Sequence, residues 1–191
     1  MPRNIEFNSD AVLSAAMHEF RMRGYAGVSI KDLERATGLT SGSLYNSFGG
    51  KDQIFTRILE HYNEVVVRKR VKDHLETNSP LEGLRSLFMS LLEESNDETF
   101  GCLLTNTAIE FGASDSVAKS SVQEGFDILE HAFQEAVNRL EQTAFSVGLA
   151  ISAEKLLTLY QGVLVLVRFG RTKDQLRQLI NNEFNQLMET T

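Results

Sequence analysis

Residues 24–51 read GYAGVSIKDLERATGLTSGSLYNSFGGK, and this stretch decides the fold of the N-terminal part of the chain. Ser29 offers a side-chain oxygen to cap a short helix. Gly38 ends that helix, because glycine readily adopts the left-handed conformation found after helix C-termini. Thr40 or Ser41 can cap a second short helix directly afterwards. Helices of about two turns are not stable alone, so this pair requires a packing partner.

The second short helix begins with small and polar residues at positions 40–43. The spacing predicts that Leu44 and Phe48 are buried, while Tyr45 and Asn46 are exposed. In a helix-turn-helix, the N-terminus of the second helix reaches base edges in the major groove of DNA. Hydroxyl groups and amides at a helix N-terminus also suit phosphate oxygens. The pattern therefore predicts a DNA-reading helix.

Longer helices are predicted on both sides of this pair. Before it, Ser9 and Asp10 offer capping oxygens to a helix whose apolar positions recur at helical spacing as far as Phe20. After it, Lys51 opens a long apolar pattern that predicts a connecting helix over 51–75. The first helix supplies the packing partner, so we expect a compact three-helix unit.

The remainder of the chain has the same helical character. Only 2 of the 191 residues are proline, and residues that lose little rotamer freedom in a helix are abundant. The valine-rich run 163–167 favours a strand by composition, but it lies inside a longer apolar pattern that is typical of a buried helix. We expect an all-α fold of about nine helices. They are predicted over residues 9–23, 30–36, 41–48, 51–75, 80–92, 100–111, 116–142, 153–169 and 173–188.

The segment 24–51 resembles the N-terminal domain of the TetR/AcrR family of repressors. The landmarks that agree are AAMHEFRMRGY over 15–25, TGL over 37–39 and GSLY over 42–45. The resemblance implies that bases are contacted near the start of the second short helix, and phosphates by the tyrosine and the following lysine. The DNA-binding residues expected here are Ser29, Thr40, Ser41, Gly42, Ser43, Tyr45, Asn46 and Lys51.

The same resemblance implies a division of the chain. Residues 1–50 would form the DNA-binding domain, 51–75 the connecting helix, and 76–191 a helical domain that binds an effector and forms a homodimer through its last two helices. Apolar residues on the first of these helices can make a self-complementary face, although an ordinary core helix has the same pattern. The expected dimer residues are Leu156, Leu159, Tyr160, Val163, Leu164 and Val167.

The effector site is predicted from aromatic and polar residues of the C-terminal part. Aromatic residues at helical spacing either line an apolar cavity or form plain core. Asn106 and Glu110 lie one helical turn apart, so both can face the interior or both can face solvent. The expected ligand-binding residues are Tyr62, Phe88, Cys102, Asn106, Glu110, Phe126 and Phe133.

Cys102 is the single cysteine of the chain. A thiol near a helix N-terminus can have a lowered pKa and react with oxidants or electrophiles, and some members of the resembled family sense such agents through a cysteine. A buried and inert cysteine is the competing interpretation. A thiol-based sensor is therefore the alternative to an effector-binding repressor.

Charge is divided unevenly along the chain. Its formal net charge is −7, to which residues 1–75 contribute +2 (11 Lys+Arg against 9 Asp+Glu) and residues 76–191 contribute −9 (8 against 17). This distribution is consistent with nucleic-acid binding by the N-terminal part. The apolar stretch 156–169 is too short to cross a bilayer, and we see no leader segment, so a cytoplasmic protein is expected.

Enzymatic activity is not supported by the sequence. The four histidines are dispersed without metal-ligand spacing, and no glycine-rich dinucleotide signature is present. No metal or cofactor is expected. We predict a homodimeric, effector-responsive repressor of a near-palindromic double-stranded DNA operator. A dimeric ligand-binding protein that never contacts DNA is the remaining alternative.

Overall fold

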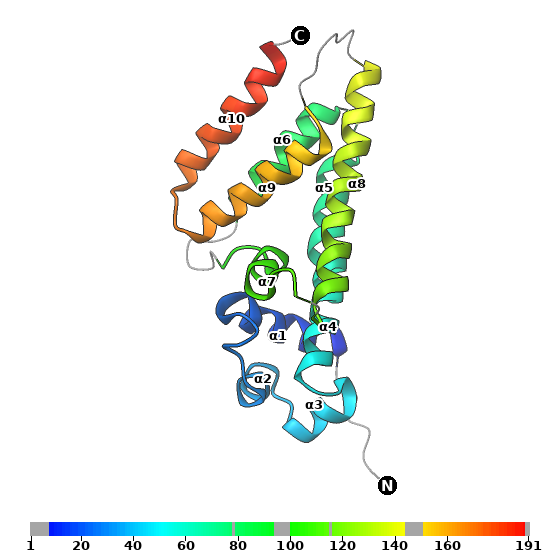
Figure 1. Cartoon of the computed structure of the whole chain (residues 1–191), viewed down its shortest axis with the longest axis vertical. Helices are drawn as coiled ribbons and strands as arrows, with labels where there is room; N and C mark the ends of the chain where they lie inside the picture. The colour runs from blue at the N-terminus through cyan, green and yellow to red at the C-terminus, as the bar shows by residue number, and fades with distance from the viewer. Residues whose placement is uncertain (1–7, 78, 94–99, 115, 144–150, 190–191) are drawn as a thin grey trace.

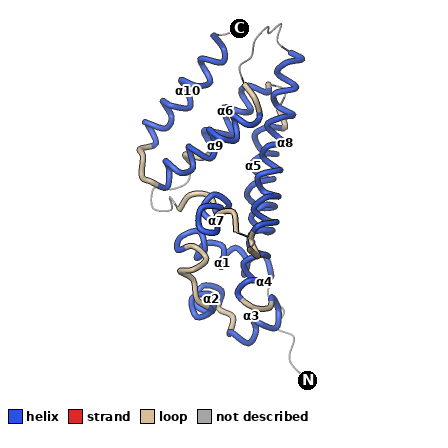
Figure 2. Tube along the Cα trace, in the orientation of Figure 1, coloured by secondary structure: helices blue, strands red, loops and turns tan. Residues whose placement is uncertain are grey.

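The computed structural model describes residues 8–77, 79–93, 100–114, 116–143 and 151–189. Every regular element in these ranges is helical (Figures 1 and 2), which confirms the all-α prediction. The elements are α1 (Ser9–Arg23), α2 (Ile30–Thr37), α3 (Ser41–Phe48), α4 (Lys51–Tyr62), the π-helical segment η1 (Asn63–Arg68), α5 (Lys69–Leu75), α6 (Pro80–Ser90), α7 (Leu103–Phe111), α8 (Lys119–Thr143), α9 (Ala153–Arg168) and α10 (Lys173–Glu189).

Helices α4, η1 and α5 follow one another without a break, so the described ranges contain nine continuous helices. A π-helical segment accommodates an extra residue per turn and commonly occurs near functional sites. Asn63 begins this segment, is buried, and donates from Nδ2 to the carbonyl of Ser121 on α8 at 2.9 Å. The bond joins the long helix to α8, which runs beside it in Figure 1.

Helix α8 approaches its neighbours closely at Gly125. A Cβ atom there would lie 2.3 Å from Leu104 Cδ1 and 2.6 Å from Asn63 Oδ1. A side chain at position 125 would have to displace the side chains of Leu104 and Asn63, which are both buried. Glycine therefore permits this close packing of α8.

Helices α1 to α3 form a compact unit at the end of the molecule opposite the C-terminus (Figure 1). Asn8 caps α1, because its Oδ1 accepts from the amides of Asp10 and Ala11. The prediction that Ser9 and Asp10 cap this helix is therefore wrong by one residue. Gly38 has φ 72° and ψ 3° after α2, which confirms the expected left-handed turn.

The C-terminal helices enclose an aromatic cluster, which contains one residue from each of α6, α8, α9 and α10. The Phe88 ring lies 6.1 Å from that of Phe133 and 5.3 Å from that of Phe184, and the Tyr160 ring lies 5.4 Å from that of Phe88. All four side chains are buried. Helix α7 lies between this region and α1 (Figure 1), so it is one of the elements that join the two ends of the molecule.

Candidate nucleic-acid interface and its connections

Helix α3 begins with small and polar residues, as the sequence predicts, and we name residues 40–46 the tip of α3. Thr40 is the N-cap, and its Oγ1 accepts from the amide of Ser43 at 3.3 Å. Leu44 is buried against the other helices, while Tyr45 is 52% exposed and Asn46 is exposed. Gly42 is exposed, and a Cβ atom there would meet only Thr40 Oγ1, at an ordinary contact distance of 4.0 Å. The face is open to a large partner.

Two backbone amides at the start of α3 are already occupied. The Ser41 amide donates to the Glu34 carboxylate from α2, and the Ser43 amide donates to Thr40. The expectation that amides in this turn serve phosphate oxygens therefore does not hold for these two groups. Side chains of the tip remain as the groups available to a ligand, and Glu34 fixes α3 relative to α2.

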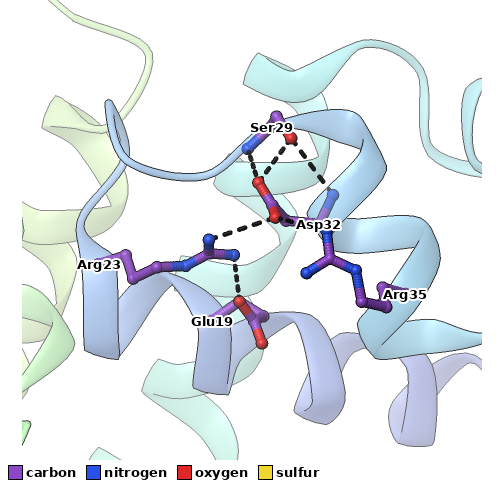
Figure 3. Close-up of polar contacts among 5 residues, drawn as sticks. All are labelled: Glu19, Arg23, Ser29, Asp32 and Arg35. Carbon is purple, nitrogen blue, oxygen red and sulfur yellow. Dashed lines mark hydrogen bonds and ion pairs between the residues drawn. The ribbon is translucent and has the colours of Figure 1, made fainter.

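Ser29 lies at the start of α2 in a capping box with Asp32, as Figure 3 shows. Its amide and hydroxyl both donate to Asp32 Oδ2, at 2.8 and 2.5 Å. The Asp32 carboxylate also pairs with Arg23 at 3.2 Å and with Arg35 at 3.1 Å. The hydrogen bonds from Ser29 and the Arg23 guanidinium hold the pKa of Asp32 well below its usual range. Asp32 thus joins α1 to α2.

Replacing Asp32 by asparagine is expected to lower the melting temperature at neutral pH. The carboxyl group has a folded-state pKa below the unfolded value of about 3.9, so its stabilisation is complete above that value and is lost as the pH falls further. The difference in melting temperature between wild type and Asp32→Asn should therefore shrink between about pH 5 and pH 2. Asp174→Asn is the control, because that residue makes an exposed ion pair with Arg177. If the difference in melting temperature stays constant at acid pH, the lowered pKa of Asp32 is contradicted.

Lys51 sits over an aromatic ring at the start of α4. Its Nζ lies 4.1 Å from the ring centroid of Tyr25, which is a cation–π contact. The Tyr25 hydroxyl donates to the carboxylate of Asp52. Burial and this carboxylate raise the pKa of Tyr25 to about 12, so the phenol is neutral at physiological pH. The ring and the lysine therefore form a fixed pair beside α3.

Glu110 connects α7 to the same tyrosine. Its carboxylate accepts from the amides of Tyr25 at 2.8 Å and Ala26 at 2.7 Å, just after α1. The sequence left open whether Glu110 faces the interior or solvent, and in the structure its side chain faces the N-terminal unit. Phe111 adds a ring contact with Tyr25, at 5.2 Å between centroids. The C-terminal end of α7 is thus fastened to the N-terminal unit.

The N-terminal end of α7 is also fastened to α1. Arg21 donates to the carbonyl of Gly101 from Nε at 3.1 Å and from Nη2 at 2.8 Å. Asn106, expected to bind ligand, donates instead to the carbonyl of Phe100 at 2.8 Å. Its side chain supports the turn that leads into α7.

The expected effector residues are divided among different environments. Phe88 and Phe133 belong to the aromatic cluster and pack directly against other rings, as plain core does. Tyr62 is buried and donates its hydroxyl to the sulfur of Cys102 at 3.4 Å. Phe126 lines a cleft between α7 and α8.

Cys102 is 6% exposed and lies at the N-cap of α7. Its environment is the Tyr62 hydroxyl and core side chains rather than solvent. Redox-sensing cysteines are solvent-accessible, so burial favours the inert interpretation of this thiol.

A cleft of about 420 Å³ lies between α7 and the first half of α8, which we name the α7–α8 cleft. This volume is in the range of small-molecule sites, about 300–1,000 Å³. Phe111, which contacts Tyr25, is one of its walls. The apolar residues that line it include Ala108, Phe111, Ala118, Val122 and Phe126.

The dimer residues expected on α9 mostly face the core of their own chain. Leu159 is half-buried, and the other five are buried. The prediction that those five form the self-complementary face is wrong, because a single chain already covers them. Their exposed neighbours are Val165 at 44%, Phe169 at 80% and, on α10, Leu179 at 37%.

Among the described residues, no group of three or more histidine, cysteine, aspartate or glutamate side chains is arranged to hold a metal ion. Across the same ranges, no helix combines the length and the apolar character needed to span a membrane.

The geometry defines a class of protein, the helical regulators that carry an N-terminal helix-turn-helix. Residues 12–58 match the family described as "Bacterial regulatory proteins, tetR family". The HTH-type transcriptional repressor DhaR of Mycobacterium sp. (strain GP1) is 24% identical over 177 residues, covering 90% of this chain and 88% of DhaR. The repressor ComR of Escherichia coli (strain K12) is 24% identical over 179 residues, covering 91% of this chain and 85% of ComR.

A solved structure gives the same fold. It is a cysteine mutant of the TetR-family regulator CifR complexed with 26-bp double-strand operator DNA, with a TM-score of 0.79 and 23% identity, covering 96% of this chain and 98% of CifR. The N-terminal domain of this chain therefore matches that of the TetR family of transcriptional regulators. The members of this family are regulators rather than enzymes.

Proposed function

We propose that this chain is a homodimeric repressor that binds a near-palindromic operator through α3 and releases it when a small effector binds its C-terminal helices. The observation that carries the proposal is the open tip of α3, where Tyr45 is 52% exposed on a helix otherwise anchored by buried Leu44. Small polar residues at that helix end are the groups that read base edges.

Lys51 supports the same proposal from the start of α4. An ammonium group beside the recognition helix neutralises a backbone phosphate and fixes the register of the protein on the duplex. The names of the relatives agree, since DhaR and ComR are described as repressors and CifR is described in complex with operator DNA.

A homodimer through α9 and α10 supplies the two recognition helices that a palindrome requires. Val165 on α9, Phe169 at the C-cap of α9 and Leu179 on α10 are exposed apolar residues. Gly162 is exposed on the same stretch of α9, and a Cβ there would meet nothing within 4 Å. This part of α9 is open to close approach by a second copy.

The test is titration of a fluorescent duplex that carries the upstream region of the protein's own gene, at low and moderate salt. We expect specific binding by two chains per duplex, with an affinity that falls linearly on a log–log plot against salt. Tyr45→Ala should weaken binding at least tenfold, because a hydrogen bond to a charged phosphate contributes about 1.5–3 kcal/mol.

Lys72→Ala is the control, because it also truncates an exposed side chain to alanine. Lys72 is exposed on α5, and α5 lies away from α3 in Figure 1. Its affinity for the duplex should equal that of wild type. Equal binding to a scrambled duplex, or an unchanged affinity in Tyr45→Ala, contradicts the proposal.

The alternative of a thiol sensor has less support than effector binding. An oxidant or electrophile needs access to the Cys102 sulfur, which is buried beneath Tyr62. Reversible binding of an effector requires no such access, and the α7–α8 cleft is open.

A further inference from the structure

We propose that Arg168 is a positioning residue for operator binding, because it fastens the end of α9 to the end of α1 and thereby sets the half-site spacing that the dimer accepts. The inference rests on the proposed function, in which α9 belongs to the dimer interface and α3 reads DNA. A bound effector plays no part in it.

Arg168 lies in the last turn of α9 and reaches two other segments of the chain. Its Nη1 donates to the carbonyl of Arg21 on α1, 147 residues away along the chain, at 3.2 Å, and also to the carbonyl of Phe100 before α7. Arg21 in turn donates from Nε and Nη2 to the carbonyl of Gly101. We name Arg21, Phe100, Gly101 and Arg168 the α1–α9 junction. It holds the ends of α1 and α9 and the start of α7 together (Figure 1).

The chemistry of the α1–α9 junction suits a guanidinium group. Arg21 lies in the last turn of α1, and the last four carbonyls of a helix have no partner within it. A cation at this end also interacts favourably with the helix dipole. Each Nη of a guanidinium carries two N–H groups, so one nitrogen can donate to two carbonyls. Arg168 thus satisfies a carbonyl at the end of α1 and another in the turn before α7.

The turn that Arg168 binds is supported from three helices. The ring of Phe100 meets that of His18 on α1 edge to face, with 5.2 Å between centroids. Asn106 on α7 donates to the carbonyl of Phe100 at 2.8 Å. Gly101 has φ 72°, and a Cβ atom there would lie 3.2 Å from Arg168 Cβ, so α9 approaches the turn closely. Arg168 therefore binds a turn whose position is fixed by its own contacts.

On the α9 side, the α1–α9 junction adjoins residues that are open to a second copy. Val165 is 44% exposed three residues before Arg168, and Phe169 is 80% exposed directly after it. A second copy that packs on these residues fixes the end of α9 relative to the twofold axis of the dimer. The hydrogen bonds of Arg168 then fix α1 relative to the same axis.

On the α1 side, contacts continue to the recognition helix. Arg23 at the end of α1 pairs with Asp32 of α2 at 3.2 Å, and Glu34 of α2 accepts from the amide of Ser41 at the start of α3. The separation of the two α3 helices in a dimer sets the spacing of the half-sites, about 34 Å for successive major grooves. Without the Arg168 side chain this separation is less constrained. Binding then becomes weaker at the native spacing and more tolerant of other spacings.

The first test measures affinity for three duplexes. Footprinting on the upstream region of the gene locates the half-sites, which are then kept at their native separation or moved one base pair closer or further apart. Wild type should bind the altered duplexes at least about tenfold more weakly, because one base pair both shifts and rotates a half-site. Arg168→Ala should bind the native duplex about threefold more weakly and retain at most about a threefold preference for it.

Arg171→Ala is the matched control. It removes the same charge from an exposed position three residues further along, and within the described ranges its side chain makes no hydrogen bond with the α1–α9 junction. It should bind all three duplexes as wild type does. Arg168 is also exposed, so its substitution should leave the melting temperature almost unchanged. Arg168→Gln, whose side chain is too short to bridge both carbonyls, should lose the preference in the same way.

The second test needs no DNA. A spin label on Lys31→Cys, an exposed position of α2, reports the distance between the two N-terminal units of the dimer by double electron–electron resonance. Cys102→Ser is present in every protein compared, so that the label has a single site per chain. The distance distribution should be narrow with Arg168 in place, broader in Arg168→Ala, and unchanged in Arg171→Ala.

The outcomes separate this inference from the proposed function. If wild type binds the duplex as a dimer, three results overturn the inference alone: an unchanged spacing preference in Arg168→Ala, an equal loss of affinity for all three duplexes, or a distance distribution that does not broaden. An equal loss at every spacing would show a purely structural role for Arg168. A wild-type protein that binds no duplex, or that is a single chain in solution, overturns the proposed function and the inference with it.

Discussion

Replacing Phe88 by alanine is expected to lower the free energy of unfolding by about 3–5 kcal/mol, the range for truncation of a fully buried phenylalanine. Phe88 is 0% exposed, and its ring contacts those of Phe133 and Phe184. The substitution removes the transfer energy of the ring and leaves a cavity between helices that cannot fully close. Urea denaturation at fixed protein concentration measures the change.

Ile109→Ala is the control, because this large apolar side chain on α7 is 69% exposed. Its free energy of unfolding should stay within about 0.5 kcal/mol of wild type. A loss below about 1 kcal/mol in Phe88→Ala would contradict the tight packing. It would instead restore Phe88 and Phe133 as candidates for an effector cavity.

The N-terminal unit could be predicted from sequence because its signals act over a few residues. Ser29 and Asp32 form a capping box, Gly38 takes the left-handed turn, and Thr40 caps α3. Each of these interactions depends on groups at most three residues apart or on one residue's own dihedral angles. Local chemistry therefore specifies both helices and the turn between them.

The position of Glu110 could not be predicted in this way. Helical spacing places Asn106 and Glu110 one turn apart but does not say which surface lies opposite them. The partners of Glu110 are the amides of Tyr25 and Ala26, which are 85 and 84 residues away along the chain. Such a contact depends on how α7 packs against α1, which is a tertiary property.

The outward-facing side of helix α9 could not be predicted from the sequence either. Its residues are apolar on nearly all sides, so periodicity does not separate the side that faces the core from the side that faces outward. Val163 is buried and Val165 is 44% exposed, although the sequence offers no distinction between them. The π-helical segment η1 could not be predicted from the sequence, because one widened turn leaves the apolar pattern of a long helix almost unchanged.

The second large effect is expected at Tyr25, on the affinity for operator DNA. This expectation rests on the proposed function. Tyr25→Leu removes the ring face that lies 4.1 Å from Lys51 Nζ, so the ammonium group is no longer held where a phosphate would meet it. We expect duplex binding about tenfold weaker, with the slope of log affinity against log salt reduced by about one. A purely structural loss would lower the affinity without changing that slope.

Tyr25→Phe separates the ring from the hydroxyl, since it keeps the aromatic face and removes the hydrogen bond to Asp52. It should retain the wild-type slope. Lys51→Gln should show the reduced slope of Tyr25→Leu, and the double variant should show no further reduction, because both substitutions remove the same phosphate contact. If the double variant loses a second unit of slope, the tyrosine and the lysine act on different phosphates, and the ring does not position the lysine.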